Sequence, residues 1–142
     1  MKLMSSKLFA TSLTLAALAA CTSMAAAPTK VSDGVLVGPN GMTLYTFDKD
    51  VAGSGKSVCN GPCAINWPPL IAADTDKAAG GYSIVVRDDG AKQWAAMGKP
   101  LYYWIKDTKP GDKTGDGVNQ VWKTAKPMSG MSAGGMGGGG GY

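Results

Sequence analysis

Histidine and glutamate are absent from this chain of 142 residues, and Arg87 is its only arginine. Without histidine, the chain lacks both the side chain used most often as a general base and the commonest imidazole metal ligand. The main groups left for catalysis are Asp, Lys, Cys, Tyr, Ser and Thr, so most hydrolase constellations are unavailable. The composition therefore predicts a protein that is not an enzyme, and no cofactor is expected.

A strong charge of one sign is also missing. The formal net charge is +4, and it falls to +2 without Lys2 and Lys7 of the predicted leader, because 12 Lys and Arg then face 10 Asp. One arginine among mixed lysines and aspartates gives no basic patch for a phosphate backbone. Nucleic acid is therefore not expected as a partner.

No apolar run is long enough to span a membrane. The longest, Leu8 to Ala20, is interrupted by polar residues and is shorter than the ~20 residues that a spanning helix needs. With Lys2 and Lys7 beside it, the run has the form of a secretory signal, so residues 1–20 predict export.

The end of this run, Leu18-Ala19-Ala20-Cys21, resembles the lipobox of bacterial lipoproteins. The resemblance implies that Cys21 becomes the acylated, palmitate-bearing first residue and anchors the protein in a membrane. Cleavage after Ala25-Ala26-Ala27 is the alternative. Enteric lipoproteins kept in the inner membrane carry Asp after the cysteine, whereas Thr22 stands here, so the resemblance favours the outer membrane, facing the periplasm.

If Cys21 carries lipid, Cys59 and Cys63 remain as a pair. We expect a disulfide bond between them in an oxidising compartment, with Asn60-Gly61-Pro62 making the turn. A redox pair and a copper(I) site remain the alternatives, since thiolates are soft metal ligands.

A ten-residue pattern occurs twice, at Gly41–Asp50 and at Gly98–Asp107, and reads Gly-x-x-Leu-Tyr-x-aromatic-x-Lys-Asp in both places. Each copy is followed by a polar, Gly-rich segment and then a tryptophan, Trp67 or Trp122. Such self-similarity predicts one β unit used twice around a shared core.

Period-2 alternation predicts two strand faces in each copy. One face carries Tyr45 and Phe47 or Tyr102 and Trp104, and the other carries Leu44 or Leu101. The aromatic residues, with Trp67 and Trp122, are expected in the core, because a small domain needs large side chains to bury enough area. A ligand-binding aromatic surface is the alternative, and in an intermediate arrangement the tyrosine hydroxyls bond Asp50 and Asp107.

Tyr45–Asp50 and Tyr102–Asp107 resemble the Tyr-x-aromatic-x-x-Asp signature of a family of predicted bacterial lipoproteins, also called the secreted repeat of unknown function. Cys59–Pro69 and the region from Asp88 to Asp112 resemble it as well, and the match covers roughly Val31 to Pro127. Because the family is defined by sequence and not by a known reaction, the resemblance implies little about activity.

We expect an all-β fold, a small barrel or sandwich built from two related β repeats. The expected order is a signal peptide over 1–20, a tether over 21–30, the repeat domain over 31–127 and a disordered Met- and Gly-rich tail over 128–142. Strands are predicted at 35–37, 43–47, 82–87, 92–97, 101–105 and 120–124, and the first two and the next two are expected to form hairpins.

Two metal sites are conceivable. Met128, Met131 and Met136 carry thioethers, which select copper(I) or silver. Asp107, Asp112 and Asp116 could hold calcium, although aspartate beside glycine is the usual chemistry of turns. The sequence thus predicts a non-enzymatic envelope lipoprotein that binds an unknown small molecule, cell-wall component or protein, with a periplasmic copper or silver handling protein as the alternative.

Overall fold

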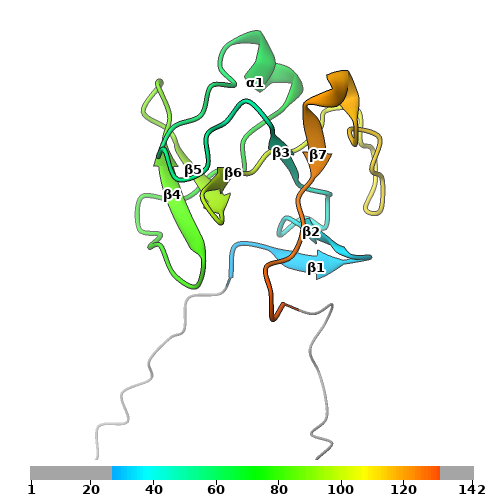
Figure 1. The fold of residues 1–142 in the computed structure, drawn as a ribbon, viewed down its shortest axis with the longest axis horizontal. Helices are drawn as coiled ribbons and strands as arrows, with labels where there is room; N and C mark the ends of the chain where they lie inside the picture. Colours follow the sequence, from blue (N-terminus) through cyan, green and yellow to red (C-terminus); the bar gives the residue numbers. More distant parts are fainter. Residues whose placement is uncertain (1–26, 132–142) are drawn as a thin grey trace, which may run out of the picture.

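A computed structural model describes residues 27–131. Within this range the fold is all-β, as predicted, with three small antiparallel sheets that do not close into a barrel (Figure 1). The sheets pair β1 with β2, β3 with β7, and β4 with β5 and β6. The elements are β1 Lys30–Ser32, β2 Val35–Val37, β3 Tyr45–Phe47, α1 Pro62–Asn66, β4 Tyr82–Val86, β5 Lys92–Ala96, β6 Lys99–Pro100, the 3-10 helix η1 Val118–Gln120 and β7 Trp122–Thr124. None of the helices in this range is long and apolar enough to cross a membrane.

Two hairpins begin the two halves of the domain. β1 and β2 are joined by Asp33 and Gly34, which have φ angles of 50° and 75°, as an Asp-Gly hairpin turn requires. β4 and β5 are joined through Asp88-Asp89-Gly90, and Gly90 has a φ of 84°. The second hairpin confirms the prediction for 82–97. The first was not predicted, because the tether was expected to run to Lys30.

The repeat segments meet at the centre of the molecule. The backbone of Tyr45 donates to the carbonyl of Tyr102 at 2.8 Å, and Tyr102 donates back to Tyr45 at 3.0 Å. The pattern continues outward, since Leu44 donates to Leu36 at 2.9 Å and Leu101 donates to Trp94 at 2.9 Å. The two copies are therefore related by an approximate twofold axis that passes between the two tyrosines.

The structure differs from two predictions about strands. No strand covers 101–105, where only Tyr102 makes isolated bridges, one of them to Pro69. Tyr103 still donates to the carbonyl of Pro68 at 2.7 Å, but Pro68 has no N–H to donate in return, so the ladder along this segment stays incomplete. The strand predicted at 43–47 is confined to β3 and pairs with β7, whereas its link to β2 is a single bridge between Val37 and Thr43.

The predicted alternation is confirmed, because the two faces of the repeat segments enter different cores. Leu44 and Leu101 lie in a core with Leu36, Leu70 and Ala125, here called the leucine core. The aromatic core holds the opposite face and consists of Tyr45, Phe47, Cys59, Trp67, Tyr102 and Trp122, with Trp104 packed against it.

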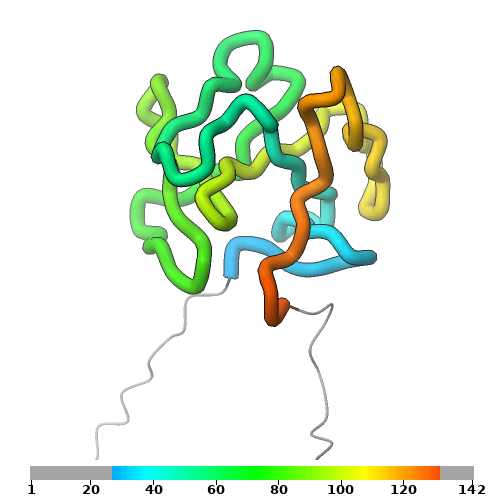
Figure 2. The backbone as a smooth tube through the Cα atoms, in the orientation of Figure 1, coloured from blue at the N-terminus to red at the C-terminus, as the bar shows by residue number. Residues whose placement is uncertain are grey.

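The backbone tube shows that the described chain begins and ends at the same end of the domain (Figure 2).

Candidate functional site

The tyrosine and aspartate of the repeat motif bond each other across the two copies. The Tyr45 hydroxyl donates to Oδ2 of Asp107 at 2.6 Å, and the Tyr102 hydroxyl donates to Oδ2 of Asp50 at 2.5 Å. The pKa of both tyrosines is raised above the ordinary value, mainly by burial and further by these hydrogen bonds. The intermediate arrangement, in which the hydroxyls bond Asp50 and Asp107, is therefore present, and it joins one repeat to the other.

The second oxygen of each aspartate holds a loop of its own repeat. Oδ1 of Asp50 accepts the N–H of Val58 at 2.8 Å. Oδ1 of Asp107 accepts the N–H of Thr114 at 3.0 Å and its hydroxyl at 2.6 Å. Each carboxylate is thus used fully in holding the fold together, and the motif is a structural clasp.

Arg87 is buried at the centre of a polar network that the sequence did not predict. Its guanidinium donates to the Ser57 hydroxyl at 3.0 Å, to Gln93 at 2.7 Å and to the carbonyl of Cys59 at 2.5 Å. Ser57 in turn lies 2.6 Å from the Tyr102 hydroxyl. A lone arginine at the end of the strand predicted over 82–87 was the available signal. The network fixes the loop that carries the disulfide bond.

Four aromatic rings stack in a row through the aromatic core. Phe47 stacks on Trp122, Trp122 on Trp67, and Trp67 on Trp104, with centroids 4.3, 3.8 and 4.0 Å apart. The row follows the twofold relationship, because Phe47 and Trp104 occupy the same motif position. Phe47, Trp67 and Trp122 are buried, which confirms their expected role in the core.

The predicted disulfide bond between Cys59 and Cys63 is present, with α-carbons 5.2 Å apart. The short helix α1 begins at Pro62, inside the closed loop. Pro at the first helical position is favoured, since its missing N–H would have no partner there. The pair is therefore closed as a structural crosslink.

The aspartates considered for calcium accept backbone N–H groups and do not form a metal cluster within residues 27–131. Asp112 accepts the N–H groups of Thr108 and Lys109 at 2.9 and 3.2 Å, and these bonds hold the pKa of its carboxyl below the ordinary value. Asp116 accepts the N–H of Thr124 at 2.9 Å. Between residues 27 and 131, no three Cys or Asp side chains are grouped to hold a metal ion.

Met128 and Met131 are half-buried against the leucine core. The Tyr82 hydroxyl lies 3.5 Å from the sulfur of Met131. Met136, the third predicted thioether ligand, lies outside the described residues, as do Cys21 and the signal peptide. The predicted copper or silver site and the lipid anchor both stay predictions.

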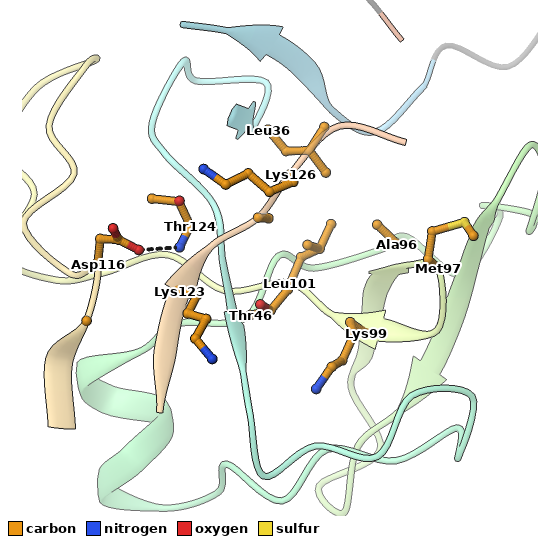
Figure 3. A pocket seen from close by; sticks show the side chains of 12 residues that line it. Leu36, Thr46, Ala96, Met97, Lys99, Leu101, Asp116, Lys123, Thr124 and Lys126 are labelled. Atoms are coloured by element: carbon orange, nitrogen blue, oxygen red, sulfur yellow. Dashed lines mark hydrogen bonds between the residues drawn. The ribbon is translucent and has the colours of Figure 1, made fainter. Parts of the chain in front are cut away.

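An open pocket of about 570 Å³ lies over the leucine core. Leu36, Ala96, Leu101 and Ala125 form its floor, and all four are buried. Thr46 of β3 lines one wall, as Figure 3 shows. Three lysines stand around the pocket, Lys99 from β6 and Lys123 and Lys126 from β7 and the residues just after it. Sequence reasoning missed this site, because its residues come from both repeats.

A second hollow of about 380 Å³ is lined by Tyr82, Trp94 and Met131. It also borders Ala27 and Pro28, where the described chain begins. The first pocket is defined entirely by residues within the domain, and we therefore treat it as the candidate site.

A family model described as "Secreted repeat of unknown function" matches residues 28–71 and 83–126, and the chain belongs to this family. The two matches correspond to the two halves of the domain. No curated protein and no solved structure matches the chain. The family places the protein among secreted proteins, and it names neither a ligand nor a reaction.

Proposed function

We propose that this secreted repeat protein is a non-enzymatic envelope lipoprotein whose domain binds a small molecule in the lysine-lined pocket over the leucine core. The observation that carries the proposal is the pocket itself, which has an apolar floor and a few polar groups at its edge. Its volume of about 570 Å³ is that of a typical small-molecule site.

We propose a non-enzymatic role because the buried charged side chains are engaged in bonds within the fold. Asp50, Asp107 and Arg87 are buried, and their side chains hold loops of the fold. In residues 27–131, no buried side-chain nitrogen or oxygen lacks a hydrogen-bond partner. An acid or base committed to internal bonds in this way is not presented to a substrate.

Anchoring through acylated Cys21 is part of the same proposal. The described chain begins and ends at one end of the domain (Figure 2), so a tether that arrives at Ala27 leaves the opposite end of the domain free. Metabolic labelling with a palmitate analogue tests the anchor. The exported chain should take up label, and the Cys21→Ser variant should not, whereas equal labelling of the two would overturn the anchor.

Ligand binding is tested on a soluble form that comprises residues 22–142. A panel of small apolar compounds, with neutral, anionic and cationic members, is titrated into the isotope-labelled protein and followed by NMR. We expect shifts at Ala96, Leu101 and Ala125, which lie on the pocket floor. If no compound shifts these residues, the pocket is not a binding site.

A further inference from the structure

Thr46 and Tyr103 occupy equivalent positions in the two halves of the domain. Each directly follows the central tyrosine of its repeat, and these tyrosines pair with one another at 2.8 and 3.0 Å. The neighbours correspond too, because Thr46 pairs with Lys123 of β7 and Tyr103 donates to the carbonyl of Pro68 at 2.7 Å. The two side chains therefore cover the same region of their respective halves.

On its side of the twofold axis, Tyr103 fills the region over the leucine core. Its ring packs against the leucine core and extends over Gly38, where a β-carbon would lie 2.0 Å from the tyrosine oxygen. Gly38 thus leaves room for the ring, which is half-buried. Burial raises the pKa of the Tyr103 hydroxyl above its ordinary value.

Thr46 leaves the equivalent region open on the other side of the twofold axis. Its side chain ends after the β-branch, and it faces Ala96 of the second repeat, which corresponds to the Gly38 of the first repeat that lies under Tyr103, because Val37 bridges Thr43 as Ala95 pairs with Pro100. The candidate pocket lies between Thr46 and Ala96, over Leu36, Leu101 and Ala125 (Figure 3). The pocket is therefore the space that an aromatic ring occupies in the related half.

The charge at the edge of this space is positive. Among residues 27–131, Lys99 donates only to neutral backbone carbonyls, those of Phe47 and Asp50, at 3.2 and 2.8 Å. Lys126 is exposed and makes no ion pair with the described residues, whereas Lys123 is paired with Asp48 at 2.5 Å. Asp116 is the one acidic residue among those that line the pocket. The lysines outnumber it, so an anion is favoured over a cation.

We propose that the pocket takes a small aromatic anion, with its ring over the leucine core in the place equivalent to that of Tyr103 and its negative group beside Lys126. The inference rests on the proposed small-molecule function and names the chemistry of the ligand. The shape of the pocket favours an aromatic ring, and the lysines at its edge favour a negative charge.

Four probes test the preference for a ring and the preference for a negative charge separately. Naphthalene-2-carboxylate, 2-naphthylmethanol, naphthalene-2-methylammonium and decanoate are titrated into residues 22–142 at low salt and followed by NMR at the pocket residues. We expect the carboxylate to bind about tenfold more tightly than the neutral alcohol, and the ammonium to bind more weakly still. We expect decanoate to bind more weakly than naphthalene-2-carboxylate, because it lacks the ring.

Three outcomes overturn the inference in different ways. Equal binding of the naphthyl carboxylate and alcohol rules out the anion preference, and equal or tighter binding of decanoate rules out the ring preference. In both cases the small-molecule function stands. If none of the probes shifts the pocket residues, the inference and the proposed function fail together.

Substitutions at Thr46 test whether the ring of the ligand lies in the pocket beside this residue. Thr46→Phe should fill the pocket as Tyr103 fills its half, and weaken naphthalene-2-carboxylate binding by about tenfold or more. Thr46→Val keeps the size and shape of threonine and should bind within about twofold of the unaltered protein. Thr46→Leu is a second filling variant if Thr46→Phe does not fold. Unchanged binding to a folded filling variant would contradict the proposed position of the ligand.

A substitution at Lys126 tests the charge. Lys126→Gln should reduce the preference for the carboxylate over the alcohol by about threefold, since the lysine is exposed and its charge is partly screened. Lys56→Gln, in a loop outside the pocket lining, is the matched control and should leave the preference unchanged. An equal effect of both substitutions would show that only the overall charge matters, and would contradict a role for Lys126.

Discussion

Tyr45 and Asp107 lie 62 positions apart, in different repeats, and the hydroxyl of the first donates a 2.6 Å hydrogen bond to the carboxylate of the second. In the related pair, the hydroxyl of Tyr102 in the second repeat donates to the carboxylate of Asp50 in the first at 2.5 Å. Each repeat therefore completes the buried polar site of the other, and neither half has a satisfied core on its own.

Removing either hydroxyl should destabilise the domain. Tyr45→Phe and Tyr102→Phe each delete a bond to a buried carboxylate, and each should lower the free energy of unfolding by about 1.5–3 kcal/mol. Tyr103→Phe is the control, because the Tyr103 hydroxyl makes no hydrogen bond to the described residues. Denaturant unfolding measures all three. A loss for Tyr103→Phe as large as for the other two would contradict the account.

Alkaline pH should destabilise the domain from about pH 10 upward. The fold raises the pKa of Tyr45 and Tyr102 above the ordinary 10.0, mainly by burial. Above that pH, the unfolded chain has lost the two protons while the folded chain keeps them. Their contribution to stability is therefore complete below pH 10 and falls above it by about 1.4 kcal/mol per pH unit for each tyrosine.

The measurement is tyrosinate absorbance recorded together with circular dichroism during a pH titration. We expect Tyr45 and Tyr102 to ionise only as the domain unfolds. The matched control is the same titration in denaturant, where all tyrosines should ionise near the ordinary value. Ionisation of every tyrosine near pH 10 in the folded protein would show that the hydroxyls are not held as described.

Gly115 should not tolerate a side chain. A β-carbon there would lie 2.8 Å from Trp67 and 3.0 Å from Trp104, and both rings are held in the stack. Gly115→Ala should therefore lower the free energy of unfolding by about 1–3 kcal/mol, as overpacking does. Thermal unfolding measures the loss, and near-ultraviolet circular dichroism reports the stack. A variant that is as stable as the unaltered protein, with the same spectrum, would show that the rings can move apart.

Reduction of the disulfide bond should cost little stability. The Cys59–Cys63 loop has a sequence separation of 4, and the entropic model gives about 2 kcal/mol for so short a loop. Unfolding with and without a reductant, beside the Cys59→Ala, Cys63→Ala double variant, measures the difference. Complete unfolding on reduction would mean that the crosslink does more than close its own loop.

The period-2 pattern of the repeats was enough to predict which residues face each core. Leu44 and Leu101 lie in one core and Tyr45 and Tyr102 in the other, because alternation along an extended chain follows from backbone geometry alone. The pairing between copies could not be predicted in this way. Spacing within a copy does not reveal whether a tyrosine bonds the aspartate of its own repeat or that of the other.

The candidate pocket was hidden in a difference between the copies. The copies differ at the middle position of Tyr-x-aromatic, where one has Thr46 and the other Tyr103, and the residues that they share do not reveal the pocket. The strand predicted at 101–105 was wrong for a related reason, since the Pro68 and Pro69 that interrupt its pairing are distant in sequence. Both features depend on which segments meet in space.

The exchange of tyrosine–aspartate pairs between the repeats is tested most directly by double-mutant cycles. Tyr45→Phe is combined with Asp107→Asn in one cycle and with Asp50→Asn in the other, and the free energy of unfolding is measured for each variant. Partners in direct contact couple by about 0.5–3 kcal/mol, and we expect this for Tyr45 with Asp107 and a value near zero for Tyr45 with Asp50. Coupling of Tyr45 to Asp50 instead would place the pair within one repeat and contradict the account.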